Sequence, residues 1–318
     1  MHFSSKQTLL AAALLVALWP AFAKEPAQLV RPPHGVVGVQ DAQLTPDFWV
    51  KQLGNDADRV LLDKAANDTA SDFVRGKIAE IVKDAATARL LQPNSHPIGT
   101  KRICVDTDYF ATFNRPNVTL VDIKTDPIEE ITENAVRVAG KDYEVDALVL
   151  ATGFDAMTGL VAKIDIVGRE RRTLNRKWAE GPRTYLGLMS AGFPNLFIIT
   201  GPGSPSVLSN MIVSIEQHVD WISDCLVYMR GNGLVTMEAT KAAEDKWVEH
   251  VNEVAHTTLY PQAASWYMGA NIPGKPRIFM PYIGGVPVYR QKCNEVAANG
   301  YEGFVMTGAE QRQTAAAS

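Results

Sequence analysis

The sequence predicts an α/β protein with parallel strands, a small antiparallel meander and a helical C-terminal region. Two short apolar runs, at 147–151 and 196–199, lack polar alternation, which is typical of strands buried on both faces of a parallel sheet. Each run ends in a glycine-containing turn. An apolar stripe follows the second turn, from Val207 to Leu226, with the spacing of a helix that packs on a sheet.

Composition and charge narrow the class of protein. The chain has 318 residues, 46% hydrophobic and 21% charged, which is ordinary for a soluble globular protein of roughly two domains. A net charge of -4 provides no field that would gather nucleic acid, so no nucleic-acid partner is expected. Cys104, Cys225 and Cys293 lie far apart in the sequence, which predicts reduced or buried thiols.

The first 23 residues have the anatomy of a secretory signal peptide. Lys6 precedes an apolar run at 9–18, and Ala21-Phe22-Ala23 forms a small-residue cleavage site. The run is shorter than the roughly 20 residues that cross a bilayer, so export without a stable membrane span is expected. Residues 24–62 are rich in proline, which predicts an extended arm. Residues 308–318 are expected to form a disordered tail.

The other elements follow in chain order. Apolar spacings between Asp63 and Leu91 predict helix, which Pro93 ends. Strand-like segments separated by turn signals predict the antiparallel meander, at 118–121, 130–131, 135–138 and 143–145. A helix is expected at about 239–255, and the proline-rich region after it is expected to form loops that line a site.

The turn Gly201-Pro202-Gly203 is the strongest physical indication of a ligand. Glycines allow a ligand to approach the backbone, and the start of a helix offers free N–H groups and a partial positive charge. The alternative is a tight strand-to-helix connection without a ligand, because Gly-x-Gly without a third glycine is a weak fingerprint.

Three further segments suggest contacts to a ligand. Thr152 and Gly153 follow the first apolar run, and ligands of open parallel sheets bind beyond the carboxyl ends of the strands. Lys101 and Arg102 would place an ammonium group for a phosphate beside a guanidinium for an oxyanion. Trp266 offers stacking surface. The alternatives are a simple turn, a solvated surface and a core aromatic residue, respectively.

Two kinds of site are disfavoured. His250 and His256 would lie on different helix faces, and no cysteine or carboxylate cluster completes a set of metal ligands. A serine hydrolase lacks its Gly-x-Ser-x-Gly turn, because Ser204 lies between Gly203 and Pro205.

Several segments together resemble one family, the Baeyer–Villiger monooxygenases of the cyclohexanone and phenylacetone monooxygenase branch. The resemblance covers roughly three quarters of the chain. It rests on the order and spacing of Gly99–Arg102, Ala151–Asp155, Trp178–Gly187, Gly201–Pro205 and Ala264–Tyr267. It implies a partial two-dinucleotide-binding-domain flavoprotein fold, with an edge of the NADP domain at 63–146 and the C-terminal part of the FAD domain at 147–307.

The resemblance also implies a chemistry. In this family NADPH reduces FAD, oxygen adds to the flavin as a peroxide, and the peroxide attacks a ketone to give an ester or lactone. FAD and NADPH are therefore the expected cofactors and a small ketone is the expected substrate. Arg102 would stabilise the negative flavin peroxide and the tetrahedral intermediate, and Lys101 would pair with the 2′-phosphate of NADP.

The remaining site residues follow from the same motif match. Met211 would touch the flavin, with Thr152, Gly153, Gly201 and Gly203 as further cofactor contacts. Ser206, Val207 and Leu208 would line the substrate pocket. Trp266 would contact NADP from a mobile loop.

The chain also departs from the family. The glycine fingerprints Gly-x-Gly-x-x-Gly of the FAD and NADP domains are absent from the sequence. The leader and arm stand in their place, which predicts a fused or truncated product joined between about Gly54 and Ala65. The first hypothesis is a Baeyer–Villiger monooxygenase by descent, and the alternative is a non-catalytic exported remnant or binding protein. A secreted hydrolase rests on the arm alone.

Overall fold

A computed structural model describes residues 60–104 and 106–309. The predicted signal peptide, most of the predicted arm and most of the predicted tail lie outside the described residues. The chain divides into two compact units, the first ending at Gly153 and the second beginning at Phe154. This division falls a few residues after the boundary at 146/147 that the sequence predicts.

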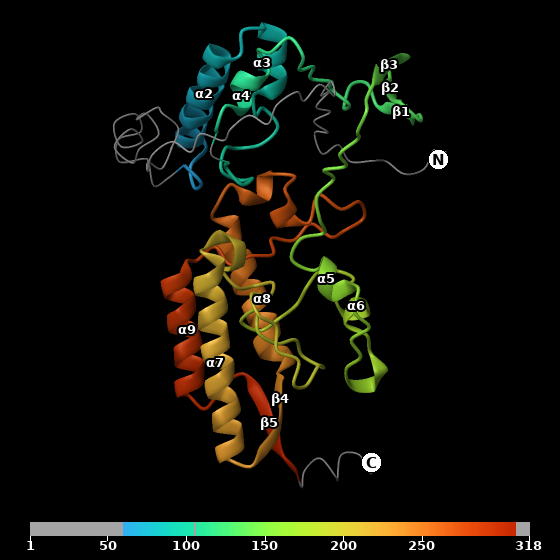
Figure 1. The fold of residues 1–318 in the computed structure, drawn as a ribbon. Helices are drawn as coiled ribbons and strands as arrows, with labels where there is room; N and C mark the ends of the chain where they lie inside the picture. The colour runs from blue at the N-terminus through green and yellow to red at the C-terminus, as the bar shows by residue number, and fades with distance from the viewer. Residues whose placement is uncertain (1–59, 105, 310–318) are drawn as a thin grey trace, which may run out of the picture. The chain divides into compact units, whose positions relative to one another are not determined.

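The described part of the first unit begins with three helices: α2 (Lys64–Ile81), α3 (Ala85–Leu91) and α4 (Tyr109–Thr112) (Figure 1). The side chain of Asp63 caps α2 by accepting a hydrogen bond from the Ala66 N–H at 2.9 Å. Asp84 caps α3 in the same way. The predicted helical region is therefore two helices, because the cap at Asp84 starts a new one.

The predicted meander is confirmed for three of its segments. Strands β1 (Ile128–Ile131), β2 (Ala135–Val138) and β3 (Lys141–Glu144) pair antiparallel in the order β1-β2-β3. Arg137 on β2 pairs with Glu130 and Asp142 on the neighbouring strands at 3.1 and 2.6 Å. The segment 118–121 does not form a strand, so that part of the prediction is wrong.

Neither apolar run that predicts a parallel strand forms one. Residues 147–151 and 196–199 are irregular, and Val149 and Leu150 are 73% and 64% exposed. A strand inside a parallel sheet needs hydrogen-bonded neighbours on both edges. The strand pairs in the described residues are all antiparallel and include neither run. The prediction of two buried strands is therefore wrong for these segments.

The second unit is built around three long helices and one strand pair. The helices are α7 (Met211–Gly231), α8 (Lys241–His256) and α9 (Val286–Ala298), and β4 (Leu234–Ala239) pairs antiparallel with β5 (Phe304–Gly308) (Figure 1). They enclose a core that includes Leu188, Trp221 and Met237. The helix predicted at 239–255 is confirmed as α8, whereas β4, β5 and α9 were not predicted. Pro287 fits the first turn of α9, where its missing N–H is not needed.

Short elements connect these parts of the second unit. Two are single-turn α-helices and four are 3₁₀ turns: α5 (Gly159–Ala162), α6 (Leu174–Lys177), η2 (Arg169–Arg171), η3 (Ser206–Leu208), η4 (Tyr260–Gln262) and η5 (Trp266–Met268). Two of the predicted site segments, at Ser206 and Trp266, therefore lie in 3₁₀ turns.

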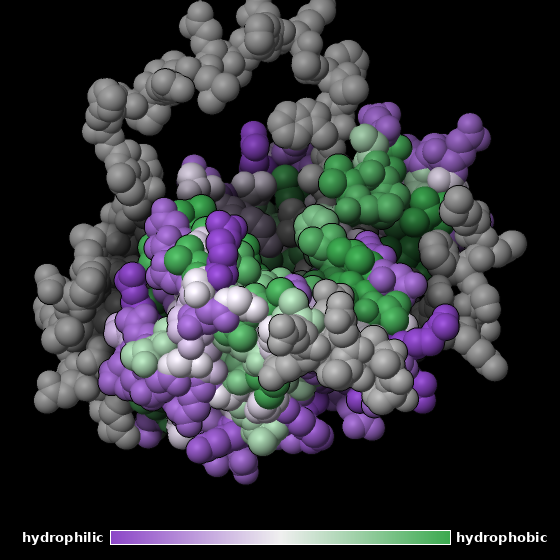
Figure 2. Space-filling model, turned by 90° about the horizontal axis from the view of Figure 1, so that it is seen from below, coloured by the Kyte–Doolittle hydropathy of each residue, from purple (hydrophilic) through white to green (hydrophobic). Residues whose placement is uncertain are grey.

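Helix α7 buries a different face from the predicted one. The predicted stripe includes Ile212, Val219 and Leu226, which are 62%, 42% and 48% exposed. The buried face is made of Ser214, Gln217, His218, Trp221, Cys225 and Met229. Apolar spacing alone could not select between the faces, because α7 carries apolar residues on both. Figure 2 shows apolar residues that reach the surface among polar ones.

Two expectations of the sequence concern membranes and thiols. Within the described residues, no helix combines the length and the apolar character that a membrane crossing requires. Cys104 is exposed, Cys225 and Cys293 are buried, and all three are free. Burial raises the pKa of the Cys225 and Cys293 thiols to about 11, so both stay protonated near neutral pH.

Candidate active site

The glycine turn at 200–206 is held by hydrogen bonds from several directions. The Gly203 N–H donates to the Met280 carbonyl at 2.7 Å, and the Trp247 indole N–H donates to the Gly203 carbonyl at 3.0 Å. The Thr184 hydroxyl donates to the Pro202 carbonyl. Residues 201–206 are all buried. The turn is therefore fixed by its own unit.

Close packing requires the two glycines of this turn. A Cβ atom on Gly201 would lie 2.5 Å from the Gly187 carbonyl oxygen. Gly203 has a φ of +85°, and a Cβ there would lie 3.2 Å from the Thr184 hydroxyl. The glycines thus serve internal packing, as the tight-connection alternative requires. A cofactor contact at these two positions stays a prediction.

Left-handed backbone conformations gather around the turn. Thr200, Ser206 and Met157 have φ values of 52°, 43° and 66°. Such values are uncommon for residues other than glycine, and they concentrate at functional sites because the surrounding structure must hold them in place. The conformations therefore point to this part of the second unit as the candidate site.

Ser206 brings two methionine side chains together. Its hydroxyl lies 3.8 Å from the Met157 Sδ and 4.0 Å from the Met211 Sδ. Val207, Leu208 and Met211 are half-buried and continue from Ser206 into α7. We call Ser206, Val207 and Leu208, together with Met211 at the start of α7, the shelf. The structure thus brings together the predicted substrate-pocket residues and the predicted flavin contact.

Sequence reasoning missed Met157. It follows the predicted motif Ala151–Asp155 by two positions, so proximity to that motif was the available signal. Sequence reasoning also placed the start of α7 too early. The helix begins at Met211, where the Asn210 side chain accepts a hydrogen bond from the Ile212 N–H at 3.0 Å.

The loop that carries Trp266 is tied to the segment after Gly153. Asn271 donates to the Phe154 carbonyl at 2.9 Å, and Lys275 forms an ion pair with Asp155. Trp266 is half-buried and lies against Tyr267, with 4.0 Å between ring centroids. These ties hold the loop against the same segment that contains Met157.

An unsatisfied polar atom lies next to Trp266. Ser265 is only 2% exposed, and its buried hydroxyl makes no hydrogen bond. Buried hydroxyl groups in folded proteins are usually hydrogen-bonded. The Ser265 hydroxyl is therefore a group that a ligand or a water molecule would satisfy.

The other predicted site residues lie in the first unit. Lys101 is half-buried, and burial together with the charge of Lys124 lowers its pKa. Arg102, Thr152 and Gly153 are exposed. Burial lowers the pKa of His96, and the charges of Lys101 and Lys124 lower it further. Basic groups thus gather around Lys101, as an anion would require.

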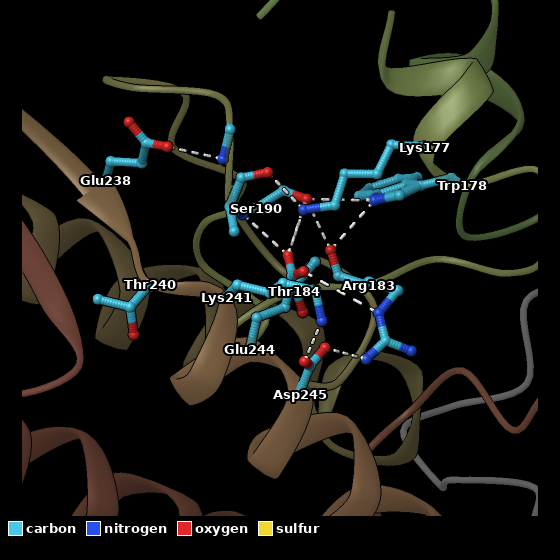
Figure 3. Close-up of polar contacts among 12 residues, drawn as sticks. Lys177, Trp178, Arg183, Thr184, Ser190, Glu238, Thr240, Lys241, Glu244 and Asp245 are labelled. Atoms are coloured by element: carbon cyan, nitrogen blue, oxygen red, sulfur yellow. Dashed lines mark hydrogen bonds and ion pairs between the residues drawn. The ribbon is translucent and has the colours of Figure 1, made fainter. Parts of the chain in front are cut away.

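A buried ion pair and its hydrogen bonds join α6, α8 and the segment 183–191 (Figure 3). Lys177 and Glu244 form an ion pair at 2.7 Å, and their side chains are 7% and 2% exposed. Glu244 also accepts hydrogen bonds from the Ala191 N–H at 2.8 Å and the Ser190 hydroxyl at 3.1 Å. Burial lowers the pKa of Lys177, and Glu244 opposes that shift. The network fixes α8 to the segment 183–191.

The segment that this network fixes supports the glycine turn. It contains Thr184, which holds Pro202, and Gly187, whose absent Cβ would lie 2.7 Å from the Ser204 Cβ. The sequence motif Trp178–Gly187 therefore supports the turn by direct packing and hydrogen bonding. In the described residues, no cluster of three or more His, Cys, Asp or Glu side chains could hold a metal ion.

Comparison with known proteins decides the relationship. No family model matches the chain. A Baeyer–Villiger monooxygenase of Pseudooceanicola batsensis is 42% identical over 247 residues, which are 77% of this chain and 45% of that protein. A cyclohexanone 1,2-monooxygenase of an Acinetobacter species is 44% identical over 240 residues, 75% of this chain and 44% of that protein. The matched part of the chain is homologous to the Baeyer–Villiger monooxygenases.

Solved structures agree with this relationship. An oxidized steroid monooxygenase bound to NADP has a TM-score of 0.74 at 48% identity and covers 81% of this chain and 49% of its own. A closed cyclohexanone monooxygenase has a TM-score of 0.77 at 39% identity, with 84% and 52% covered. The predicted resemblance and fold class are confirmed. The chain spans about half the length of the Baeyer–Villiger monooxygenases it matches.

Proposed function

We propose that the chain provides the ketone side of the flavin site in an FAD- and NADPH-dependent Baeyer–Villiger monooxygenase, which converts a ketone and oxygen to an ester or lactone. Similar proteins carry the names cyclohexanone 1,2-monooxygenase and acetone monooxygenase (methyl acetate-forming). Similar solved structures contain FAD and NADP. The second candidate is a non-catalytic binding protein.

The shelf has the chemistry that a flat ring and a small ketone require. Val207 and Leu208 are aliphatic, Met211 carries a polarizable thioether, and all three are half-buried. Ligand pockets are mostly apolar, with a few placed polar groups such as the Ser206 hydroxyl. The residues present therefore fit the ring of FAD. A diphosphate fits less well, because the N–H groups of Gly203 and Ser204 already donate within the chain.

Bound FAD would supply the redox chemistry, by accepting hydride from NADPH and activating oxygen. The protein would supply position and charge. Arg102 would hold a negative oxygen, because a guanidinium is cationic and offers several hydrogen-bond donors. Lys101, among the basic groups of the first unit, would pair with a phosphate. Val207 and Leu208 would exclude water from the ketone.

One observation carries this proposal: Met157 and Met211 converge on the left-handed Ser206. To test it, the full chain is titrated with FAD while flavin fluorescence is followed, and NADPH oxidation is then measured with and without cyclohexanone. Met211→Ala should weaken FAD binding several-fold. Val227→Ala, at an exposed position of the same helix, is the matched control and should leave binding unchanged. Equal affinities for both variants would refute the assignment of the shelf.

The binding-protein alternative has its own support. Val149 and Leu150 in the first unit are 73% and 64% exposed, and contiguous exposed apolar residues often mark interaction surfaces. A purified chain that stays colourless with FAD and does not consume NADPH would favour this second candidate.

A further inference from the structure

A buried histidine links α7 to the start of the glycine turn. His218 is 0% exposed, and its Nδ1 accepts a hydrogen bond from the Thr200 N–H at 2.8 Å. Its Nε2 lies 2.8 Å from the hydroxyl of Tyr289 on α9. The Tyr289 hydroxyl donates to the Leu186 carbonyl. His218 and Tyr289 thus connect Thr200, α7, α9 and Leu186 through three hydrogen bonds.

We call the hydrogen-bonded series Thr200, His218, Tyr289 and Leu186 the relay. The positions of its protons follow from which groups can donate and which can accept. A backbone N–H only donates, so the Nδ1 of His218 must be the acceptor and its proton must reside on Nε2. That proton is donated to the Tyr289 oxygen, which leaves the phenol proton for the Leu186 carbonyl. Burial lowers the pKa of His218 to about 4 and raises that of Tyr289 well above its usual value. Both groups are therefore neutral near pH 7, as the relay requires.

The relay ends on two strained segments that lie against each other. Thr200 and Leu186 have left-handed φ values of 52° and 57°. Thr200 precedes Gly201, and Leu186 precedes Gly187, whose carbonyl oxygen would be 2.5 Å from a Cβ on Gly201. Such conformations persist only where the surroundings impose them. His218 and Tyr289 supply one hydrogen bond to each segment.

We propose that His218 and Tyr289 are positioning residues that hold the turn 200–206, and with it the shelf, in the conformation that accepts the flavin ring. This rests on the proposed function of the shelf. A core role alone would not require an imidazole, since burying a polar ring is unfavourable unless its hydrogen bonds are made. Only an acceptor at the Nδ1 position satisfies the Thr200 N–H, and an unsatisfied buried N–H destabilises its conformation.

Two amide substitutions of His218 separate its two nitrogen atoms. The shorter side chain of His218→Asn can place an oxygen near the position of Nδ1, so it keeps an acceptor for the Thr200 N–H. The longer side chain of His218→Gln reaches the position of Nε2, so it keeps the link to Tyr289 and loses the acceptor. The two variants have the same polarity and nearly the same size. They are therefore matched controls for each other.

The experiment measures FAD affinity by fluorescence titration and amide hydrogen exchange of residues 200–203 by NMR, on the full chain. We expect His218→Gln to raise the Kd for FAD about tenfold, the equivalent of one lost hydrogen bond. Its Thr200 amide should exchange much faster than in the wild-type chain. We expect His218→Asn to stay within about twofold of wild-type affinity and to keep the Thr200 amide protected.

Three outcomes decide the matter. If Asn and Gln weaken FAD binding equally, in proportion to their unfolding free energies, His218 has only a core role and the inference is wrong. If wild-type chain does not bind FAD, the proposed function fails, whereas the exchange contrast between Asn and Gln still tests the positioning role. If either His218 variant fails to fold, Tyr289→Phe replaces it. Tyr289→Phe leaves the Leu186 carbonyl without its hydroxyl donor, and unchanged FAD affinity in this variant would overturn the inference.

Discussion

The turn 200–206 and the run 147–151 have contrasting environments. Residues 201–206 are buried without exception, and their backbone groups bond to α8, to the Trp266 loop and to one another. In the run, only Leu148 is half-buried and the other residues are exposed. The turn contains the glycine motif Gly201–Pro205 and the run leads into the glycine motif Ala151–Asp155, so the presence of a motif does not explain the difference.

The contrast shows that a motif segment is buried and hydrogen-bonded only where other segments of its own unit pack against it. The buried ion pair of Lys177 and Glu244 holds the segment 183–191 that packs on the turn, and His218 accepts a hydrogen bond from Thr200 at its start. Val149 and Leu150 lack such support in the first unit, where the sheet of the described residues is the meander β1 to β3. Variants in the two regions should therefore have very different effects on stability.

The largest effect on stability is expected at the buried ion pair of Lys177 and Glu244. Lys177→Met removes the close ion-pair partner of the buried Glu244 carboxylate and leaves it only Arg183, at 4.0 Å, so the free energy of unfolding should fall by about 3–5 kcal/mol. Arg137→Met removes two exposed ion pairs on the meander and should change the free energy of unfolding by no more than about 1 kcal/mol. Urea denaturation measures both values. Similar losses for the two variants would remove the distinction between the regions.

The next effect concerns pH. His218 has a pKa of about 4 in the folded chain, below its unfolded value, so the unfolded state binds more protons in between. Stability is therefore retained above about pH 6.5 and lost as the pH falls toward 4, by about 3 kcal/mol in total. His218→Asn should remove this component of the pH dependence, as thermal unfolding across that pH range would show. An unchanged pH profile in the variant would contradict the buried neutral imidazole.

A smaller effect is expected at the glycines. Gly201→Ala places a Cβ 2.5 Å from the Gly187 carbonyl oxygen, and the overpacking should destabilise the chain by about 1–3 kcal/mol. Gly153→Ala meets no atom within 4 Å, although its φ is +78°, so only the backbone strain of about 1 kcal/mol is expected. Chemical denaturation compares the two. A larger loss at Gly153 would reverse the comparison.

The smallest effect is expected in the exposed run. Val149→Thr replaces a side chain that is 73% exposed, so stability should change by no more than about 0.5 kcal/mol. Leu188→Ala, at a fully buried core position of the second unit, should cost about 2–5 kcal/mol by the same measurement. A loss above about 2 kcal/mol at Val149 would mean that the run is buried in solution.

Local pattern was sufficient for the elements that depend on neighbours along the chain. The spacing of apolar residues and the caps at Asp63 and Thr240 are local properties, which is why α2 and α8 were predictable. Alternating residues and turn signals similarly predicted β2 and β3. The candidate site was identified by its motifs, because the order and spacing of motifs are properties of the sequence.

Other features depend on contacts between distant residues, and only the tertiary structure decided them. The pairing of β4 with β5 joins Leu234 to Gly308, and the buried face of α7 is the one where His218 meets Thr200 and Tyr289. Met157 joined the site through its contact with Ser206. The sequence by itself determined which segments can form helices, turns and motifs. The fold determined which faces are buried, because burial and hydrogen bonding require partners that local pattern does not specify.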